Sequence, residues 1–179
     1  MTLYIDGYNL IFAAASRRMP GYDISRTEAA RDTLLSLLNK YRSVRADHIM
    51  VFFDGGAEAA HLPRRQMQRG MDVLFSAVDS DADSDIKYAV SHDDQPRNIR
   101  VITSDAAIRN FVQRYGATVT ESREFLDEVA NVLRDSELPT DEPLEKYEGN
   151  ATGETDYWMN VFGLKSEEDN GNKPGGRRK

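Results

Sequence analysis

The sequence predicts an α/β domain in which a parallel β-sheet lies between two layers of helices. Short apolar runs alternate with helical patterns along most of the chain, which is the order expected of right-handed β-α-β units. The runs are continuously apolar or β-branched, as expected for strands that helices cover on both faces. The chain has 179 residues, close to the usual length of one domain.

Five segments have the composition of buried strands: Leu3–Ile5, Ile49–Phe53, Val73–Phe75, Arg100–Thr103 and Ala117–Thr120. Between them, apolar residues recur at three- and four-residue spacing, which predicts amphipathic helices. The predicted helices span about Leu10–Ala15, Ser25–Tyr41, Asp83–Ser91, Ala106–Tyr115 and Ser122–Leu133. The alternation predicts a three-layer, Rossmann-like arrangement.

The C-terminal part of the chain differs in composition. We expect the α/β domain at residues 1–135, a linker and a short helix at 136–164, and a disordered polar tail at 165–179. Residues Ser136–Gly153 are rich in Pro, Glu, Asp and Thr, and the segment that follows carries the only tryptophan, Trp158. We expect Tyr157–Phe162 to form a helix that docks on the core, and a segment that binds a partner is the alternative.

The composition excludes several classes of protein. With no cysteine, the chain has no disulfide framework, cysteine zinc site, iron–sulfur cluster or thiol nucleophile. No apolar stretch approaches the roughly 18–20 residues that span a bilayer, and the first residues run directly into a strand. We therefore expect a cytoplasmic protein without a membrane partner. The net charge of -7 does not exclude a polyanionic substrate, because a local cluster of aspartates would leave the remaining surface nearly neutral.

Several familiar α/β sites are also excluded. The first predicted strand is followed by Asp6-Gly7-Tyr8-Asn9 instead of a glycine-rich dinucleotide loop, and the chain has no phosphate-binding Gly-Lys-Ser/Thr loop. There is no Gly-x-Ser-x-Gly nucleophile elbow. The second aspartate of an aspartyl-phosphate phosphatase is missing, and the three histidines lack the spacing of metal ligands.

Aspartates follow the predicted strands at the points where the strands end. Asp6, Asp54 and Asp105 follow the first, second and fourth strands, and the acidic stretch Asp79–Asp85 follows the third. Because the carboxyl ends of parallel strands meet at one edge of a sheet, we expect these side chains to lie close together.

Carboxylates gathered at one edge repel one another. Two unit charges about 5 Å apart at an effective dielectric of about 20 cost roughly 3 kcal/mol. Protons, arginines or a cation must offset such a cost. Hard divalent cations take oxygen ligands, and Mg²⁺ uses few carboxylates together with waters and substrate phosphates. The pattern therefore favours a site for Mg²⁺ or Mn²⁺.

Each of these polar residues also has a purely structural interpretation. Asp54 lies in an Asp-Gly-Gly sequence typical of a turn. Ser104 or Asp105 could cap the following helix, and Asn9 could cap the first one. The stretch Asp79–Asp85 could be a solvated helix start. These interpretations suit any single residue better than they suit the whole set.

Four motifs carry a resemblance to a known family: Ile5-Asp6-Gly7-Tyr8-Asn9, Val51-Phe52-Phe53-Asp54-Gly55, Ala82-Asp83-Ser84-Asp85-Ile86 and Thr103-Ser104-Asp105. From Thr2 to about Arg134 the chain resembles the NYN branch of the PIN-like nuclease superfamily, and within it the YacP-like family. The resemblance implies a PIN-like fold, a metal-dependent ribonuclease and RNA as substrate. Some members of the family are ribosome-associated endoribonucleases, so the ribosome is a candidate partner.

The resemblance also assigns roles to individual residues. Asp6, Asp83 and Asp105 match the acidic metal-binding positions, and Asn9 and Ser104 match the polar residues beside them. Asp54 matches a nearby acidic position, and Asp85 is a second supporting acid. A shift of two residues in the alternating aspartates would put Asp81 or Asp85 in place of Asp83.

Arginines on segments near the same edge are candidates for binding RNA phosphates. They are Arg64, Arg65 and Arg69 in the segment Ala57–Gly70, with Arg17, Arg18 and Arg109 elsewhere. An ordinary charged surface loop is the alternative for that segment. The function predicted is an endoribonuclease that uses Mg²⁺ or Mn²⁺ to hydrolyse phosphodiester bonds. The alternative is a catalytically weak RNA-binding or ribosome-associated adaptor on a nuclease-like fold.

Overall fold

A six-stranded sheet forms the centre of the described part of the molecule, in the order β3-β4-β2-β1-β5-β6. The computed structural model describes residues 1–25, 27–55, 62–77 and 79–137. The strands are β1 (Thr2–Asp6), β2 (His48–Phe53), β3 (Arg65–Gln68), β4 (Met71–Phe75), β5 (Ile99–Ile102) and β6 (Thr118–Thr120). All run parallel except β3, which is antiparallel to β4.

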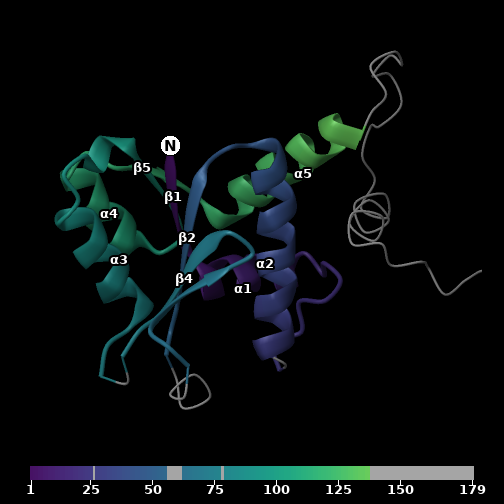
Figure 1. Cartoon of the computed structure of the whole chain (residues 1–179), viewed down its shortest axis with the longest axis horizontal. Coiled ribbons are helices and arrows are strands. Elements are labelled where there is room, and N and C mark those ends of the chain that lie inside the picture. The colour runs from purple at the N-terminus through teal and green to yellow at the C-terminus, as the bar shows by residue number, and fades with distance from the viewer. Residues whose placement is uncertain (26, 56–61, 78, 138–179) are drawn as a thin grey trace, which may run out of the picture.

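Helices cover both faces of the sheet, as predicted for the three-layer α/β fold (Figure 1). They are α1 (Gly7–Ser16), α2 (Thr27–Val44), α3 (Ala82–Ser91), α4 (Ala106–Arg114) and α5 (Ser122–Glu137). Helices α1, α2 and α5 lie on one face, and α3 and α4 lie on the other. A short 3-10 helix, Pro96–Asn98, leads into β5.

Alternation along the central strand divides the hydrophobic core in two. Leu3 and Ile5 pack toward α1, α2 and α5, while Tyr4 between them packs with the residues of α3 and α4. All three side chains are buried. Because β1 is covered on both faces, its sequence is continuously apolar, and this explains why the strand could be recognised from sequence.

The strand order reverses at β1, and this reversal determines where a ligand can bind. From β1 the chain adds β2 and β4 on one side and then returns to add β5 and β6 on the other. Open α/β sheets bind ligands outside the carboxyl ends of the strands at such a switch point. The aspartates at the carboxyl ends of β1, β2 and β5 are therefore at the favoured position.

The segment between β2 and β4 differs from the expectation of a charged loop. Residues 65–68 form the edge strand β3, which makes a hairpin with β4 through a turn at Arg69 and Gly70. Both turn residues have positive φ, 51° and 75° respectively. The sequence Arg65-Gln66-Met67-Gln68 lacks an apolar run because an edge strand has one unpaired, solvent-facing side.

No helix in the four described ranges is long and apolar enough to cross a membrane. Residues beyond 137 lie outside the described part of the chain. The expected linker, the docking helix at Tyr157–Phe162 and the polar tail therefore stay predictions, as do the domain boundaries.

An ion pair joins β5 to α5 and also includes α2. Arg100 donates to both carboxylate oxygens of Glu128, at 3.1 and 2.5 Å, and the Tyr41 hydroxyl donates to the same carboxylate at 2.7 Å. Burial raises the pKa of Glu128, but the hydrogen bonds from Arg100 and Tyr41 outweigh burial and hold the pKa below its usual range. The ionised carboxylate is therefore the form that stabilises the fold.

Replacing Glu128 with Gln should lower the free energy of unfolding at pH 7 by about 1–3 kcal/mol, because Arg100 loses its charged partner. The wild-type protein should lose the same contribution in acid. As pH falls, Glu128 of the unfolded chain is protonated before that of the native state, so the native advantage disappears as pH passes through the lowered pKa. Urea unfolding at a series of pH values measures the difference, which should shrink as pH falls.

The neighbouring residue provides a matched control. Asp127→Asn removes the pair between Arg17 and Asp127, whose carboxylate is 56% exposed, and exposed pairs contribute about 0–1 kcal/mol. Equal and pH-independent effects of the two substitutions would contradict the assignment of Glu128 as the stabilising acid.

Candidate active site

Aspartates meet at the carboxyl edge of the sheet because adjacent parallel strands end there. Asp6 is the last residue of β1, and Asp54 directly follows β2, its neighbour in the sheet. Each is followed by a glycine that a larger residue could not replace without a clash. A Cβ atom at Gly7 would lie 2.2 Å from the Phe53 ring, and one at Gly55 would lie 1.7 Å from the Ser76 carbonyl oxygen.

The carboxylate of Asp6 is buried, and its hydrogen-bond donors among the described residues are neutral. Its side chain is the N-cap of α1, accepting a hydrogen bond from the Asn9 N–H at 3.1 Å. Its other oxygen accepts from the Thr103 hydroxyl at 3.1 Å. Burial raises the pKa of Asp6 to about 6, against the effect of these two bonds, and the nearby charges of Asp83 and Asp54 raise it further. In the described part of the chain, no basic side chain pairs with Asp6.

The three alternating aspartates of the acidic stretch have three different environments. Asp81 is the N-cap of α3 and accepts from the Ser84 N–H at 2.7 Å. Hydrogen bonds from the side chain of Ser84 and then from its N–H lower the pKa of Asp81. Asp85 accepts from Arg64 at 3.2 Å. Asp83 has a raised pKa because it is partly buried and lies near Asp105, an effect that Lys87 at 3.9 Å partly offsets.

Of these three, Asp83 is the one whose charge acts on Asp6 and which also senses Asp105 and Asp54. The structure therefore brings Asp6, Asp54, Asp83 and Asp105 into one electrostatically coupled group, here called the acidic group. Asp85 lies beside the acidic group, where it is paired with Arg64.

Asp54 and Asp105 also have the structural roles that the sequence left open. Asp54 Oδ1 accepts from the Ala82 N–H at 2.7 Å and so fixes the start of α3. Asp105 Oδ1 accepts from the N–H groups of Ala107 and Ile108, at 2.6 and 2.9 Å, and is the N-cap of α4. In both residues the hydrogen bonds seen in the described structure use Oδ1 alone. A cap and a ligand role are compatible, because each carboxylate has a second oxygen.

Asn9 and Ser104 hold the loops of the site together. The alternative interpretation, in which Asn9 caps the first helix, is wrong, since α1 begins at Gly7 with Asp6 as its cap. Asn9 Oδ1 accepts from the Ser104 N–H at 3.0 Å and from the Ser122 hydroxyl at 2.7 Å. Ser104 Oγ in turn accepts from the Ser122 N–H at 3.2 Å. These contacts connect α1, the β5–α4 loop and α5, and a role in orienting ligands or water stays a prediction.

The sequence did not predict two residues that support the site. Thr103 is fully buried, donates to Asp6 and accepts from the Asp105 N–H at 3.1 Å, so it couples two members of the acidic group. Ser122 is fully buried and bonds to Asn9 and Ser104. A threonine at a strand end and a serine at a helix start are common, so neither carried a functional signal.

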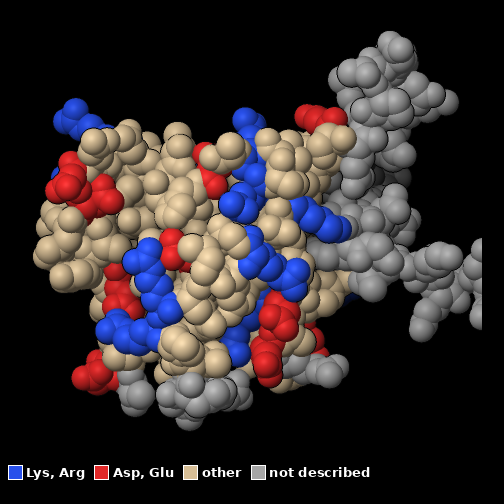
Figure 2. Space-filling view, in the orientation of Figure 1, with Lys and Arg blue, Asp and Glu red and all other residues tan. Residues whose placement is uncertain are grey.

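The predicted RNA-binding arginines divide into two groups by the elements that they contact. Figure 2 shows basic side chains over the hairpin and α2. Arg64 pairs with Asp85 of α3. Arg109, in the first turn of α4, pairs with Glu121 at 3.1 Å. Arg64 is thereby held against the helix that carries Asp83, and Arg109 belongs to the helix that Asp105 caps.

The other arginines lie elsewhere. Arg65 pairs with the buried Asp72 at 2.9 Å, Arg69 is in the hairpin turn at the amino end of β4, and Arg17 follows α1 at the end opposite Asp6 and pairs with Asp127. The structure does not bring these three to the acidic group.

The acidic group fits a hard divalent cation in its chemistry, though not as a closed cage. Its donors are carboxylate oxygens, and Asp6 is a buried acid without a basic partner in the described residues. The described ranges contain no group of three or more His, Cys, Asp or Glu side chains arranged to hold a metal ion. Mg²⁺ is commonly held by one or two carboxylates with several waters, and this mode suits the arrangement.

Comparisons with known proteins agree with the geometry. The family model described as the YacP-like NYN domain matches residues 3–157. A solved structure of a mutant of Rae1 (YacP) from Bacillus subtilis is 23% identical, with a TM-score of 0.60, and the match covers 88% of this chain and 92% of that chain. A second Rae1 (YacP) structure from the same organism is 28% identical, with a TM-score of 0.61, and the match covers 76% and 78%. No curated protein matches.

Asn9→Ala should destabilise the protein by about 1–3 kcal/mol, because the Ser122 hydroxyl and the Ser104 N–H both lose their acceptor. Thermal or urea unfolding measures the change. Asn110→Ala is the matched control, since Asn110 is an exposed residue of α4 and its loss should change stability by less than about 0.5 kcal/mol. If both substitutions were equally mild, Asn9 would not be the connection between these loops.

Proposed function

We propose that this chain, which belongs to the YacP-like NYN domain family of PIN-like nucleases, is a metal-dependent endoribonuclease. The observation that carries the proposal is the acidic group. It lies at the switch point of the sheet, and its member Asp6 is buried without a basic partner in the described residues. A carboxylate whose pKa is raised by burial and by other acids gains most from a bound cation.

The residues of the acidic group have distinct proposed roles. Asp6 and Asp83 would hold the cation, and Asp105 would contribute the third carboxylate of the metal site. Thr103 fixes the rotamer of Asp6, and the cap contacts fix Asp105, so the carboxylates are held in place before any ligand arrives. Asp54 holds the start of α3 and thereby positions Asp83. A divalent cation bound here supplies positive charge to the phosphodiester and activates a water.

The surrounding cations fit an RNA substrate. Arg64 and Arg109 are held by α3 and α4, the helices that begin at the acidic group, and each is paired with a carboxylate that is replaceable by a phosphate. Such contacts position the backbone without reading sequence. Association with the ribosome and a cytoplasmic location stay predictions for this chain.

A second candidate function is a catalytically weak RNA-binding adaptor. It is favoured by one observation, namely that no three acidic or histidine side chains in the described residues are arranged round a metal position. An adaptor, however, gains nothing from acids that repel phosphate. Metal binding and cleavage chemistry distinguish the two candidates.

Mn²⁺ or Mg²⁺ should raise the melting temperature of the wild-type protein, since a ligand that binds only the native state stabilises it. Asp6→Asn combined with Asp105→Asn should abolish that rise. Asparagine keeps an oxygen acceptor for the caps of both helices, and the loss of repulsion should leave the metal-free variant no less stable. Differential scanning calorimetry with and without metal measures the shift. An equal shift in the variant would place the cation elsewhere.

Cleavage of end-labelled RNA should leave 5′-phosphate and 3′-hydroxyl ends, be lost in EDTA and be restored by Mn²⁺. Ribonucleases that need no metal use a side-chain base, often histidine, on the 2′-hydroxyl and leave cyclic phosphates. Of the histidines in the described residues, His48 pairs with Asp72 near the opposite edge of the sheet, and His92 stacks on Tyr88 after α3. His61 lies outside the described residues. A substrate with 2′-O-methyl at the cut bond should still be cleaved if the methyl group fits.

Analysis of the ends by mass spectrometry is the direct measurement. Asp105→Asn is the control for a contaminating nuclease, because it should eliminate cleavage by this protein alone. Cyclic phosphate ends produced in EDTA would overturn the mechanism and the assigned roles of Asp6, Asp83 and Asp105.

A further inference from the structure

A pocket of about 240 Å³ lies next to the acidic group, between α1 and the start of α2. Its lining is mostly apolar and includes Tyr8, Phe12, Ile24 and Ala30, with Asp54 among the lining residues. Asp54 also belongs to the acidic group, so the pocket and the candidate active site share a residue. None of the roles assigned above uses this pocket.

Large apolar side chains at the pocket are left uncovered by the described structure. Phe12 and Ile24 are each 55% exposed, although both are large enough to be core residues. The rings of Tyr8 and Phe12 lie 6.4 Å apart and are tilted by 32°, so they present two neighbouring aromatic surfaces. Exposed apolar surface that borders a polar site commonly marks a binding position.

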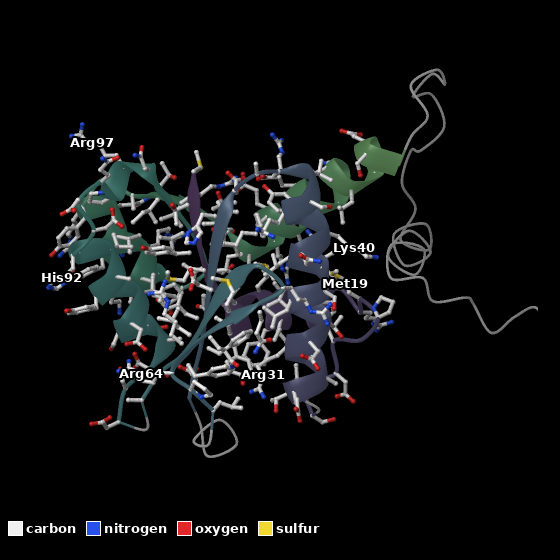
Figure 3. The ribbon with its side chains drawn as sticks, viewed as in Figure 1. Met19, Arg31, Lys40, Arg64, His92 and Arg97 are labelled. Atoms are coloured by element: carbon white, nitrogen blue, oxygen red, sulfur yellow. The ribbon has the colours of Figure 1, made fainter. Side chains whose placement is uncertain are left out.

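Arg31 lies beside the pocket and is an unusual buried cation. It is 8% exposed, donates to the Tyr8 hydroxyl at 2.9 Å and lies over the Phe75 ring at 5.5 Å. No carboxylate pairs with Arg31 within the described ranges. Figure 3 shows Arg31 at the end of the sheet where Arg64 also lies. A buried charge without a counter-ion is costly, and an anion close by would offset that cost.

We propose that this pocket binds an unpaired base of the RNA chain next to the bond that is cut, an inference that rests on the proposed function. A base offers flat faces that stack on the rings of Tyr8 and Phe12. Its amino and imino groups can donate to Asp54, whereas a phosphate in the pocket would be repelled by that carboxylate. The charge of Arg31 favours the phosphate attached to the same nucleotide.

The proposal requires a single-stranded substrate at this position. A base in a duplex is stacked and paired, so it cannot enter a side pocket without the cost of unpairing. Arg31 is a positioning residue in this arrangement, because its hydrogen bond holds the Tyr8 ring in place.

The test measures binding separately from cleavage. A fluorescein-labelled single-stranded RNA of mixed sequence is titrated with the full chain in EDTA, and fluorescence anisotropy reports Kd. Phe12→Ala should weaken binding by about 5- to 150-fold, the range for loss of one base-stacking contact. Tyr88→Ala is the matched control, since Tyr88 is a 65% exposed aromatic residue on α3 away from the pocket, and it should leave Kd within about twofold.

Abasic scanning connects the effect to one nucleotide. Removing a single base at successive positions should weaken wild-type binding most at one position, and that base should matter little to Phe12→Ala. Such non-additivity is expected only when the two groups contact each other. Tyr8→Phe, which removes the acceptor for Arg31, should weaken binding at the same position.

A stacking variant guards against misfolding of the alanine variant. Phe12→Trp should retain affinity, and its added fluorescence should be quenched by RNA beyond any change of Trp158 in the wild-type protein. Equal affinity of wild type, Phe12→Ala and Tyr88→Ala, with no position-specific abasic effect, would overturn the pocket assignment. A blue-shifted signal from Phe12→Trp that RNA leaves unchanged would mean that a protein segment fills the pocket, which also overturns it.

The outcome is separable from that of the proposed function. Base-specific binding at Phe12 without cleavage in Mn²⁺ would support the pocket and reject the nuclease. Cleavage that is equal in wild type and Phe12→Ala on limiting RNA would support the nuclease and reject the pocket.

Discussion

The buried carboxylate of Asp6 is the constraint around which this part of the molecule is arranged. Asp6 ends the central strand and caps α1 by accepting a hydrogen bond from the Asn9 N–H. It also accepts a hydrogen bond from the hydroxyl of Thr103, which follows β5. These contacts require β1, β5 and α1 to meet at one point. The absence of a side chain at Gly7 lets the chain turn into α1 against the Phe53 ring. The carboxylate is kept in place by neutral donors, which do not cancel its charge.

Polar contacts between distant segments make the site rigid before a ligand binds. Asn9, Ser104 and Ser122 come from α1, the β5–α4 loop and α5, and they form one hydrogen-bonded set. Asp54 and Asp105 fix the starts of α3 and α4 in the same region. A site built from helix starts on a packed sheet has little freedom to rearrange, and such preorganisation would suit the electrostatic role proposed for the acids.

Opposite charges around the site are separated instead of mixed. Within the described residues, Asp6 has no arginine partner. Arg64 and Arg109 pair with Asp85 and Glu121, and Arg31 is buried beside an apolar pocket. A polyanion can therefore contact cations and an apolar surface on either side of the acids. Under the proposed function, the same acids would repel an RNA chain if no cation were bound between them, so RNA affinity would depend on metal binding.

By itself, the sequence determined the layered α/β fold and the edge of the sheet at which Asp6, Asp54, Asp83 and Asp105 meet. It could do so because buried parallel strands are continuous apolar runs whose carboxyl ends share one edge. The tertiary structure decided what depends on non-local partners. It placed β3 at the edge, where a polar strand has no sequence signature, and it separated Asp81, Asp83 and Asp85, which look alike in an alternating run. It also showed that Arg17 and Arg69 lie away from the site. The position of an arginine depends on where its helix or turn ends and on which distant carboxylate it pairs with.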